Sequence, residues 1–537
     1  MLRKLITRFS DRHISPAVIM VIVISSVAFT TLVVSPGFLI DDSFIGFRYA
    51  RNLYNGAGLV FNADERVEGY TSFLWVMLSY PSFWLGIEPI TFVQMISVAA
   101  QTITLWLVYL LGNIPSRPVH RALIAPLFLA FQVSFLTFPM TGMDTTFFTM
   151  LVTLAVLLYQ RDFHKSRIGS WVMGGVLLSI GLTRFDGLAL VFILISYKLL
   201  IDREVKETIP GLIIFLIGIG LYNLWRFSYY HALLPNTFYA KVAFLNHQFI
   251  GGLKYLLSFA SAGSQFVLIL AVVPFVLGRA SKPIRFVAWV VCGHLLYVVA
   301  VGGDWMPYFR FILPVLPLLF LLMQEGIWTV YDLAKSTIQQ HRSNQLLAVF
   351  LLMILFGFNF LPVYRDRNFS QQISGALFHP EDARIIGTHL NKMLPSDYVV
   401  AIEWAGIVPF YVQHPVLDIF GLNDRDIITQ NFPGARMGRS ITAEYLASRN
   451  PHAVVLCARL FKSAEKAAEG VRLRIEFAPK DSRIRNFYAA LVSPQSPYKV
   501  CIMKINEHGY WPLLIRRDLR GQNTFCLEDE LIQVSNP

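Results

Sequence analysis

Long apolar stretches alternate with short polar segments over the first two thirds of the chain. Each stretch holds roughly 17 to 25 residues, the length that a helix needs to cross a hydrocarbon core about 30 Å thick. Transmembrane helices are predicted near residues 17–34, 90–111, 122–138, 145–160, 209–227, 262–278, 286–301, 311–331 and 346–363, with a helical hairpin over 171–201. The pattern predicts an α-helical polytopic membrane protein with about eleven spans.

The pattern changes in two other regions. Residues 72–85 are rich in aromatic residues and interrupted by Pro81, which favours an interfacial helix lying on the outer membrane surface. From residue 364 the hydropathy drops, and DYVVAIE, HPVLDIFG and PHAVVLC read as short apolar strands between turns. We therefore expect a transmembrane domain over 1–363 and a soluble α/β domain over 364–537.

Composition agrees with a membrane protein, since 55% of the residues are hydrophobic, 15% are charged and the mean hydropathy is +0.52. The net charge of +12 comes mainly from Lys and Arg between the apolar stretches, where they signal topology. A basic-aromatic stripe and zinc-finger spacing are both absent, which argues against nucleic-acid binding.

Loop charges set the expected orientation. The N-terminus carries Arg3, Lys4, Arg8 and Arg12 before an apolar run that is long for a cleaved signal, so we expect an uncleaved first span. One assignment then places the basic loops inside, the N-terminus in the cytoplasm and the tail outside a bacterial inner membrane. The tail cysteines, Cys457, Cys501 and Cys526, leave a disulfide open in an exported domain.

The predicted outer loops are rich in ionisable residues close to the membrane boundary. Such residues are costly beside lipid, so they mark a functional site. The segments are IDDSFIGFRYARNLYNGAGLVFNADERVEGYTS, FPMTGMDTT, LTRFDG, YYHALLPNTFYAK and VGGDWMPYFR.

The acidic pair Asp41 and Asp42 follows the first span directly. Adjacent carboxylates point in different directions, so one of them is expected to face a reacting atom. Partial desolvation beside lipid raises the pKa of a carboxyl group, which suits a general base. The alternative is a pair of solvated loop acids.

Several cations share that predicted membrane face. Arg48 offers a guanidinium fork that matches phosphate oxygens, although an interfacial arginine extending its charge to the interface explains it equally well. Arg184 lies at a hairpin tip with Asp186, where the two can form an internal ion pair, and Lys241 and Arg310 lie in later outer segments. Together these cations suit an anionic lipid headgroup held beside a base.

These motifs resemble the polyprenyl-phosphate-dependent glycosyltransferases of the GT-C class, and most closely the terminal β-(1→2)-arabinofuranosyltransferases of mycobacterial cell-wall synthesis. The motifs that carry the resemblance are spread over nearly the whole chain. They are DDSFIGFRYARNLYNGAGLVFNADERVEGYTSFLW, TGMDTTFF, LTRFDG, LLPNTFYAK, VGGDWMPYFRFILPVLPLL and LDIFGLND.

The resemblance implies an inverting glycosyltransferase that uses a polyprenyl-phosphate sugar donor without a metal or another cofactor. Its acceptor would be a glycan, glycolipid or glycoprotein. Asp41 is the expected base and Asp42 orients the acceptor. Donor phosphate is expected at Arg48, Arg184, Lys241 and Arg310, and sugar or acceptor hydroxyls at Glu68, Tyr70, Asp144, Asn236 and Asp304.

Two positions depart from the family pattern. Asp144 stands where Glu is more familiar and Phe185 where Pro is usual, so arabinofuranose is the favoured sugar and other sugars stay open. A transporter or flippase of lipid-linked sugars is the alternative function, but transporters place ionisable groups near the midplane of repeated halves. Here the charges gather at one interface. A non-catalytic scaffold protein is a third possibility.

Overall fold

The computed structural model describes residues 39–113, 118–241, 245–304, 306, 308–337, 379–426, 443–476 and 483–522, with scattered positions between 20 and 31. The chain forms two compact units, and neither is continuous in sequence. Unit 1 comprises Met1–Phe38, Gln94–Ile219 and Leu245–Asp366, and unit 2 comprises Leu39–Val93, Gly220–Phe244 and Arg367–Pro537. The predicted domain boundary between 363 and 364 lies outside the described residues.

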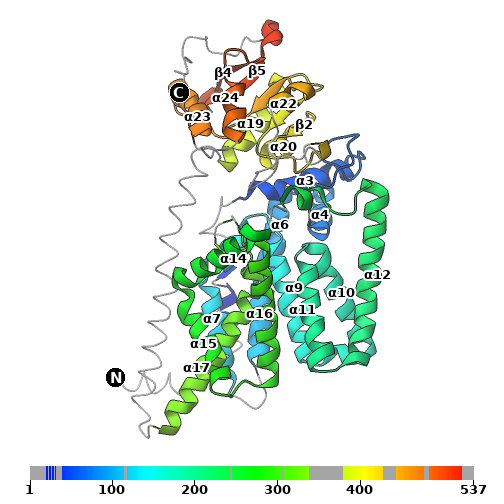
Figure 1. Ribbon diagram of the computed structural model, residues 1–537, viewed down its shortest axis with the longest axis vertical. Helices are drawn as coiled ribbons and strands as arrows, with labels where there is room; N and C mark the ends of the chain where they lie inside the picture. Colours follow the sequence, from blue (N-terminus) through cyan, green and yellow to red (C-terminus); the bar gives the residue numbers. More distant parts are fainter. Residues whose placement is uncertain are drawn as a thin grey trace. The chain divides into compact units, whose positions relative to one another are not determined.

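Unit 1 consists of apolar helices, of which α9, α10 and α11 lie side by side (Figure 1). Two further helices, α6 and α12, continue from this unit into unit 2. The α-helices are α6 (Pro89–Gly112), α7 (Ile124–Ala130), α8 (Val133–Thr137), α9 (Thr145–Gln160), α10 (Arg167–Thr183), α11 (Gly187–Ser196), α12 (Val205–Tyr230), α14 (Leu245–Phe259), α15 (Gln265–Val276), α16 (Lys282–Val301) and α17 (Leu316–Thr337).

Short tighter or wider turns join or extend these helices. The 3₁₀ turns are η1 (Val119–Leu123), η2 (Phe138–Met140), η3 (Phe163–Lys165) and η6 (Leu313–Val315), and the π-helical turns are η4 (Tyr197–Ile201) and η5 (Ala260–Ser264).

Helices occur where the apolar runs predict them, but few are long. In the described part of the chain four helices have the length and composition to cross a membrane: Pro89–Gly112, Val205–Tyr230, Lys282–Val301 and Leu313–Leu333. The count rises to six if two bent pairs are each one span. The helices α9 and α10 are shorter, at 16 and 17 residues. The count of eleven therefore stays a prediction, and the spans predicted near 17–34 and 346–363 lie largely outside the described residues.

Local sequence explains where the helices of unit 1 begin and pack. Ser166 precedes α10, and its hydroxyl accepts a hydrogen bond from the Gly169 amide (3.0 Å), which satisfies one of the free donors of the first turn. Phe148 and Val152 of α9 are fully buried. In an apolar 18-residue segment of α12, only 17% is buried within the protein, and this exposure suits contact with lipid.

Unit 2 combines the first predicted outer loop with the tail. Its helices are α3 (Asp41–Tyr54), α4 (Phe73–Ser79), α5 (Pro81–Leu85), α13 (Asn236–Lys241), α19 (Pro380–Met393), α20 (Ile407–Tyr411), α22 (Ala443–Arg449), α23 (Ala464–Glu476) and α24 (Arg483–Leu491), with 3₁₀ turns η7 (Asn506–His508) and η8 (Arg517–Gln522). The helices α4 and α5 occupy the segment 72–85 that the aromatic pattern marks as helical.

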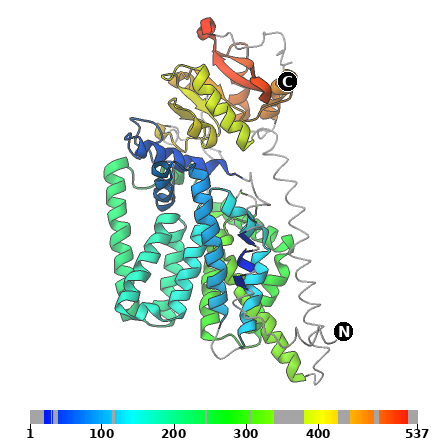
Figure 2. The same cartoon turned by 180° about the vertical axis from the view of Figure 1, so that it is seen from behind.

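The tail holds a five-stranded sheet in the order β2-β1-β3-β5-β4. The strands are β1 (Val400–Ile402), β2 (Val416–Asp418), β3 (Ala453–Val455), β4 (Tyr498–Ile505) and β5 (Gly509–Arg516). The first three are parallel, and β5 runs antiparallel to β3. This confirms the three predicted strands. The sequence prediction missed the β4–β5 hairpin, drawn in orange-red in Figure 2.

The core of the tail lies between this sheet and its helices. Ala401, Leu417 and Val454 from the three parallel strands pack with Leu446 of α22 and Tyr488 of α24. Strands that are covered in this way need apolar residues at nearly every position, which explains why short unbroken apolar runs were the signal that revealed them.

Candidate active site

The acidic pair begins helix α3 in unit 2. Asp41 is 8% exposed, and its Oδ2 and Oδ1 accept hydrogen bonds from the amides of Gly406 (2.8 Å) and Ile407 (2.7 Å). Burial raises the pKa of the Asp41 carboxyl to about 7, and the charges of Asp42 and Asp418 add to this while the two amides oppose it. Asp42 is half-buried. The raised pKa agrees in direction with the sequence prediction, but its main cause is burial within the protein.

Arg48 lies two turns further along α3 and is 3% exposed. Its Nε donates to Phe61 O (2.7 Å), and Nη2 donates to Asn62 Oδ1 (3.2 Å) and His414 O (3.0 Å). Nη1 donates to the carbonyls of Pro409 and Val412. All five N–H groups thus have acceptors within unit 2, and Arg48 would have to exchange some of these bonds to bind phosphate.

Glu68 forms a second buried carboxylate in this unit, at 3% exposed. The Tyr222 hydroxyl donates to its Oε1 (2.9 Å), and Arg226 Nε lies 3.7 Å from its Oε2. Burial raises the pKa of Glu68 to about 7 against the opposing charge of Arg226. Glu68 Oε2 and Arg226 Nε are both buried without a hydrogen-bond partner among the described residues.

Tyr70 lies beside this carboxylate in the chain, and its hydroxyl is 3.1 Å from that of Tyr230, which donates to Leu59 O (2.7 Å). The sequence prediction did not identify Tyr222, Arg226 or Tyr230. These polar residues recur every four positions on one face of an otherwise apolar helix, and that spacing was the available signal.

Asn236 connects three segments of unit 2. Its side-chain amide donates to the carbonyls of Gly421 (3.0 Å), Leu422 (3.0 Å) and Asp424 (3.1 Å), and its backbone amide donates to Glu68 O (2.9 Å). Asn236 therefore binds the GLND turn of the tail through its side chain and the first predicted outer loop through its backbone amide. Lys241 ends α13, and its side chain lies outside the described residues.

A separate cluster occupies unit 1, where Arg184 joins two carboxylates. Its Nε and Nη2 donate to Asp186 (2.8 and 3.0 Å), and its Nη1 donates to Asp144 (3.0 Å). All three side chains are buried. Asp144 precedes α9 and Arg184 follows α10, so contact between these helices brings TGMDTT and LTRFDG together.

Arg310 and Asp304 belong to the same cluster. Arg310 Nε and Nη2 donate to the two oxygens of Asp304 (2.6 and 3.1 Å). The ring of Phe311 lies 5.1 Å from the Arg310 guanidinium and 5.6 Å from that of Arg184, so one aromatic ring contacts both cations. The predicted site residues thus fall into two groups: Asp144, Arg184, Asp304 and Arg310 in unit 1, and Asp41, Asp42, Arg48, Glu68, Tyr70 and Asn236 in unit 2.

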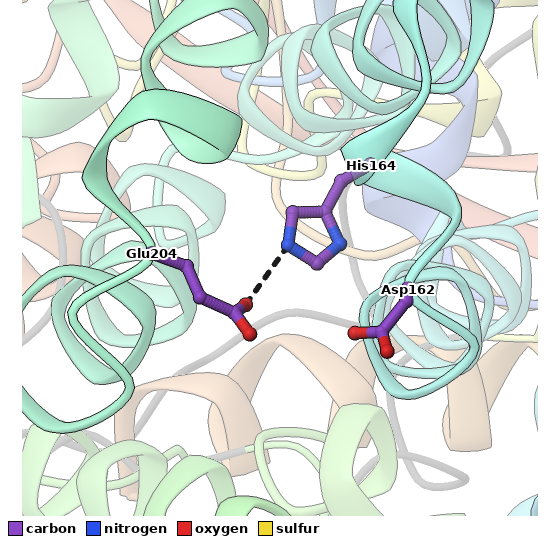
Figure 3. A group of neighbouring side chains, drawn as sticks. All are labelled: Asp162, His164 and Glu204. Atoms are coloured by element: carbon purple, nitrogen blue, oxygen red, sulfur yellow. Dashed lines mark hydrogen bonds and ion pairs between the residues drawn. The ribbon is translucent and has the colours of Figure 1, made fainter.

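One group of side chains in unit 1 has metal-ligand character. The ligand atoms of Asp162, His164 and Glu204 lie within 4.8 Å of one another, and His164 Nε2 is 3.0 Å from Glu204 Oε2 (Figure 3). However, Lys165 Nζ already bridges Asp162 (3.0 Å) and Glu204 (2.9 Å), and Lys198 contacts Glu204 at 3.2 Å. A divalent cation would have to displace these ammonium groups, so the geometry favours an ion-pair network.

Comparison with known proteins found a family model that matches the tail and curated relatives that match part of the chain. The tail matches a family model described as "Domain of unknown function (DUF8728)" over residues 370–503. The chain is 25% identical over 333 residues to a terminal β-(1→2)-arabinofuranosyltransferase of Corynebacterium glutamicum, covering 51% of this chain and 47% of that protein. It is 28% identical over 224 residues to the Mycobacterium tuberculosis protein of the same name, covering 38% and 35%. The chain therefore spans half or less of the length of these relatives.

Solved structures share the fold at low sequence identity. ArnT from Cupriavidus metallidurans in the apo state aligns with a TM-score of 0.54 and 12% identity, covering 82% of this chain and 91% of ArnT. AglB, an oligosaccharyltransferase of Archaeoglobus fulgidus whose structure contains an inhibitory peptide and a dolichol-phosphate, aligns with a TM-score of 0.54 and 11% identity, covering 92% and 74%. The chain is therefore similar in fold to these two proteins, which agrees with the fold class that the sequence motifs predicted.

Proposed function

We propose that the chain is an inverting glycosyltransferase that moves D-arabinofuranose from a polyprenyl-phosphate donor to a hydroxyl of a cell-envelope glycan or glycoprotein. The observation that carries this proposal is the Asp41 carboxylate, which is buried, held by two amides and has a pKa near neutrality. A carboxylate with these properties suits proton abstraction at physiological pH. The fold shared with ArnT supports the reaction class, and the names of the curated relatives favour arabinofuranose as the sugar.

The proposed reaction is a single displacement at the anomeric carbon. The acceptor hydroxyl gives its proton to Asp41 as its oxygen bonds to that carbon from the face opposite the phosphate. The bond from the anomeric carbon to the phosphate oxygen breaks, and polyprenyl phosphate leaves with the electron pair. The reaction therefore inverts the configuration, and an anionic phosphate monoester departs without needing a proton from the enzyme.

Candidate cations and hydroxyl-binding groups for this reaction occur in both units. Arg48, Arg184, Lys241 and Arg310 are the candidates for holding the donor phosphate, and Arg48 would have to release carbonyls of the tail to do so. Among the candidates whose side chains the structure describes, Arg310 is ion-paired to one carboxylate and Arg184 to two. A guanidinium held by a carboxylate is oriented in advance for the charge that develops on the leaving group.

Glu68, Tyr70, Asp144, Asn236 and Asp304 are the proposed contacts to sugar or acceptor hydroxyls. The best supported of these is Glu68, because its Oε2 and the Nε of Arg226 are both buried without a hydrogen-bond partner among the described residues. A sugar hydroxyl can donate to the carboxylate and accept from the guanidinium, which removes the cost of leaving both groups unsatisfied.

The proposed location is the outer side of a bacterial inner membrane, with the N-terminus in the cytoplasm and the tail exported. Cys501 in β4 is disulfide-bonded, which fits an oxidising compartment. A polyprenyl chain must stay in the bilayer, so a donor of this kind also requires the site to lie near the membrane surface.

The proposal is tested by transfer with purified protein in lipid nanodiscs. Synthetic decaprenyl-phosphoryl arabinose and a small arabinoside acceptor should give a longer arabinoside, detected by mass spectrometry, with inverted anomeric configuration by NMR. Other polyprenyl-phosphate sugars serve as competing donors and decide the sugar. Absence of transfer, together with movement of labelled lipid-linked sugar across proteoliposomes, would instead establish the transporter alternative.

The pH dependence of this transfer is a further prediction. Because Asp41 must be deprotonated to act, kcat should rise about tenfold per pH unit below its pKa of about 7 and level off above it. Removing the neighbouring charge with Asp42→Asn should lower the pKa of Asp41 and move the rise to lower pH. A kcat that is constant between pH 5.5 and 8 would contradict the assignment.

A further inference from the structure

The first predicted outer loop and the tail meet at one helix pair of unit 2. Helix α20 of the tail packs beside α3 (Figure 1). Where α20 begins, the two oxygens of Asp41 accept hydrogen bonds from the successive amides of Gly406 (2.8 Å) and Ile407 (2.7 Å). A carboxylate that accepts one bond on each oxygen has a fixed plane, so the tail sets the direction in which the remaining lone pairs point.

The C-terminal end of α20 is held by two arginines of α3. Arg51 donates to the carbonyls of Phe410 and Val412, and Arg48 donates to those of Pro409 and Val412. An acid of α3 thus binds the free amides where α20 begins, and bases of α3 bind the free carbonyls where it ends. Asp41 therefore contacts one end of the five-residue helix α20. Arg48 and Arg51, seven and ten positions further along α3, contact its other end.

The approach of the two backbones depends on Gly406. A Cβ at this position would lie 1.8 Å from the carbonyl oxygen of Asp41 and 2.8 Å from its Cγ. The nearest of these atoms is backbone, which cannot rotate away as the end of a long side chain can. Any side chain at position 406 must therefore move Asp41, Gly406 or both.

We propose that the tail is a positioning element of the active site, in which Gly406 and Ile407 orient the carboxylate of Asp41 for proton abstraction. This inference rests on the proposed function, since it takes Asp41 to be the base. It assigns a role to the tail, and it makes Arg48 and Arg51 the groups that hold the tail in place. Gly406 is a positioning residue because it acts on the transfer only through the carboxylate of Asp41.

A second contact between loop and tail supports the same role. Asp418 at the end of β2 accepts from the backbone amide of Asn423 (2.9 Å) and from its side-chain amide (2.9 Å). The Oδ1 of Asn423 then lies 3.0 Å from the Tyr49 hydroxyl of α3. Gly69 lies against it, since a Cβ there would be 1.8 Å from Asn423 Oδ1. The loop and the tail therefore fit each other at two separate glycines.

The test compares Gly406→Ala with Gly220→Ala, whose added methyl group meets nothing within 4 Å. We expect Gly406→Ala to lower kcat about tenfold or more while KM for the acceptor changes less than about threefold. We also expect the acidic limb of its pH profile to move to higher pH, because Asp41 loses donors that stabilise its charged form. Gly220→Ala should match the wild type in all three measurements.

The outcomes separate this inference from the proposed function. If the wild type transfers sugar and Asp41→Asn does not, but Gly406→Ala keeps the wild-type kcat and pH profile, the positioning role is wrong and the base remains. A uniform loss at every pH would indicate a smaller folded fraction and would also overturn it. Absence of transfer by the wild type would remove the proposed function itself.

A second measurement decides the matter if Gly406→Ala does not fold. Hydrogen exchange of the peptide 404–411 is compared between wild type, Asp41→Asn and Asp42→Asn. In Asp41→Asn the side-chain NH2 group faces one of the two backbone donors and cannot accept a hydrogen bond from it. Hydrogen exchange at Gly406 or Ile407 should therefore increase about tenfold in that variant alone. Equal protection in all three proteins would show that Asp41 does not hold these amides.

Discussion

Asp41→Asn should lower the rate of sugar transfer at least about a hundredfold, the loss expected when a positioned general base is removed. Asparagine keeps the size of the side chain but cannot accept the acceptor's proton. The measurement is kcat for arabinose transfer from the synthetic donor at pH 8, where the wild-type carboxyl, with its pKa of about 7, is largely ionised.

The neighbouring acid supplies the control for this prediction. Asp42→Asn keeps the proposed base and its amide donors, so its loss at pH 8 should be smaller than that of Asp41→Asn. Wild-type rates for Asp41→Asn, or the larger loss in Asp42→Asn, would assign proton abstraction to another group. Matched thermal melting curves for both variants are needed to exclude unfolding.

Arg184→Met should destabilise unit 1 by about 3–5 kcal/mol, the cost of removing one partner from a buried ion pair. Arg184 neutralises Asp144 and Asp186 at once, and all three side chains are buried. Without the guanidinium, two carboxylates would remain close together away from water. The expected result is a melting temperature lower by several degrees, measured in detergent.

Arg121→Met is the matched control for stability. Arg121 also binds a carboxylate through two nitrogens, but its partner Asp332 is 43% exposed. Exposed pairs contribute about 1 kcal/mol or less, so this variant should melt close to the wild type. Equal melting temperatures for Arg184→Met and the wild type would mean that the carboxylates of Asp144 and Asp186 have another partner.

Sequence patterns predicted those parts of the fold that depend on local burial. Unbroken apolar runs predicted the positions of α6, α9 and α16 and of the strands β1 to β3, because a helix or strand with buried faces must carry apolar residues. The β4–β5 hairpin was missed although VCIM and YWPLLI are unbroken apolar runs of the same kind. Pro512 lies inside the second run, and a proline within a run argues against a strand. The number of spans is harder to predict, because several helices are shorter than a bilayer requires and others are bent.

The site was predicted as a set of residues but not as a set of contacts. Arg48 illustrates the difference: a guanidinium near a membrane boundary suggests phosphate, but the structure gives it carbonyl acceptors 361 to 366 positions away in the tail. Composition cannot distinguish these partners, because both are oxygen acceptors. Arg226 was missed because the sequence prediction took residues 209–227 as one apolar span and did not use the four-residue spacing of its polar residues.

The α3–α20 contact has a consequence for the order in which the protein matures. Asp41 meets its amide donors only after 365 further residues have been made, which takes roughly 20–70 s at about 5–20 residues per second. During that interval the growing chain holds an acid without its orienting partners. Proton abstraction by Asp41, as proposed here, would then become effective only after residues 406 and 407 have been made and α20 has packed beside α3.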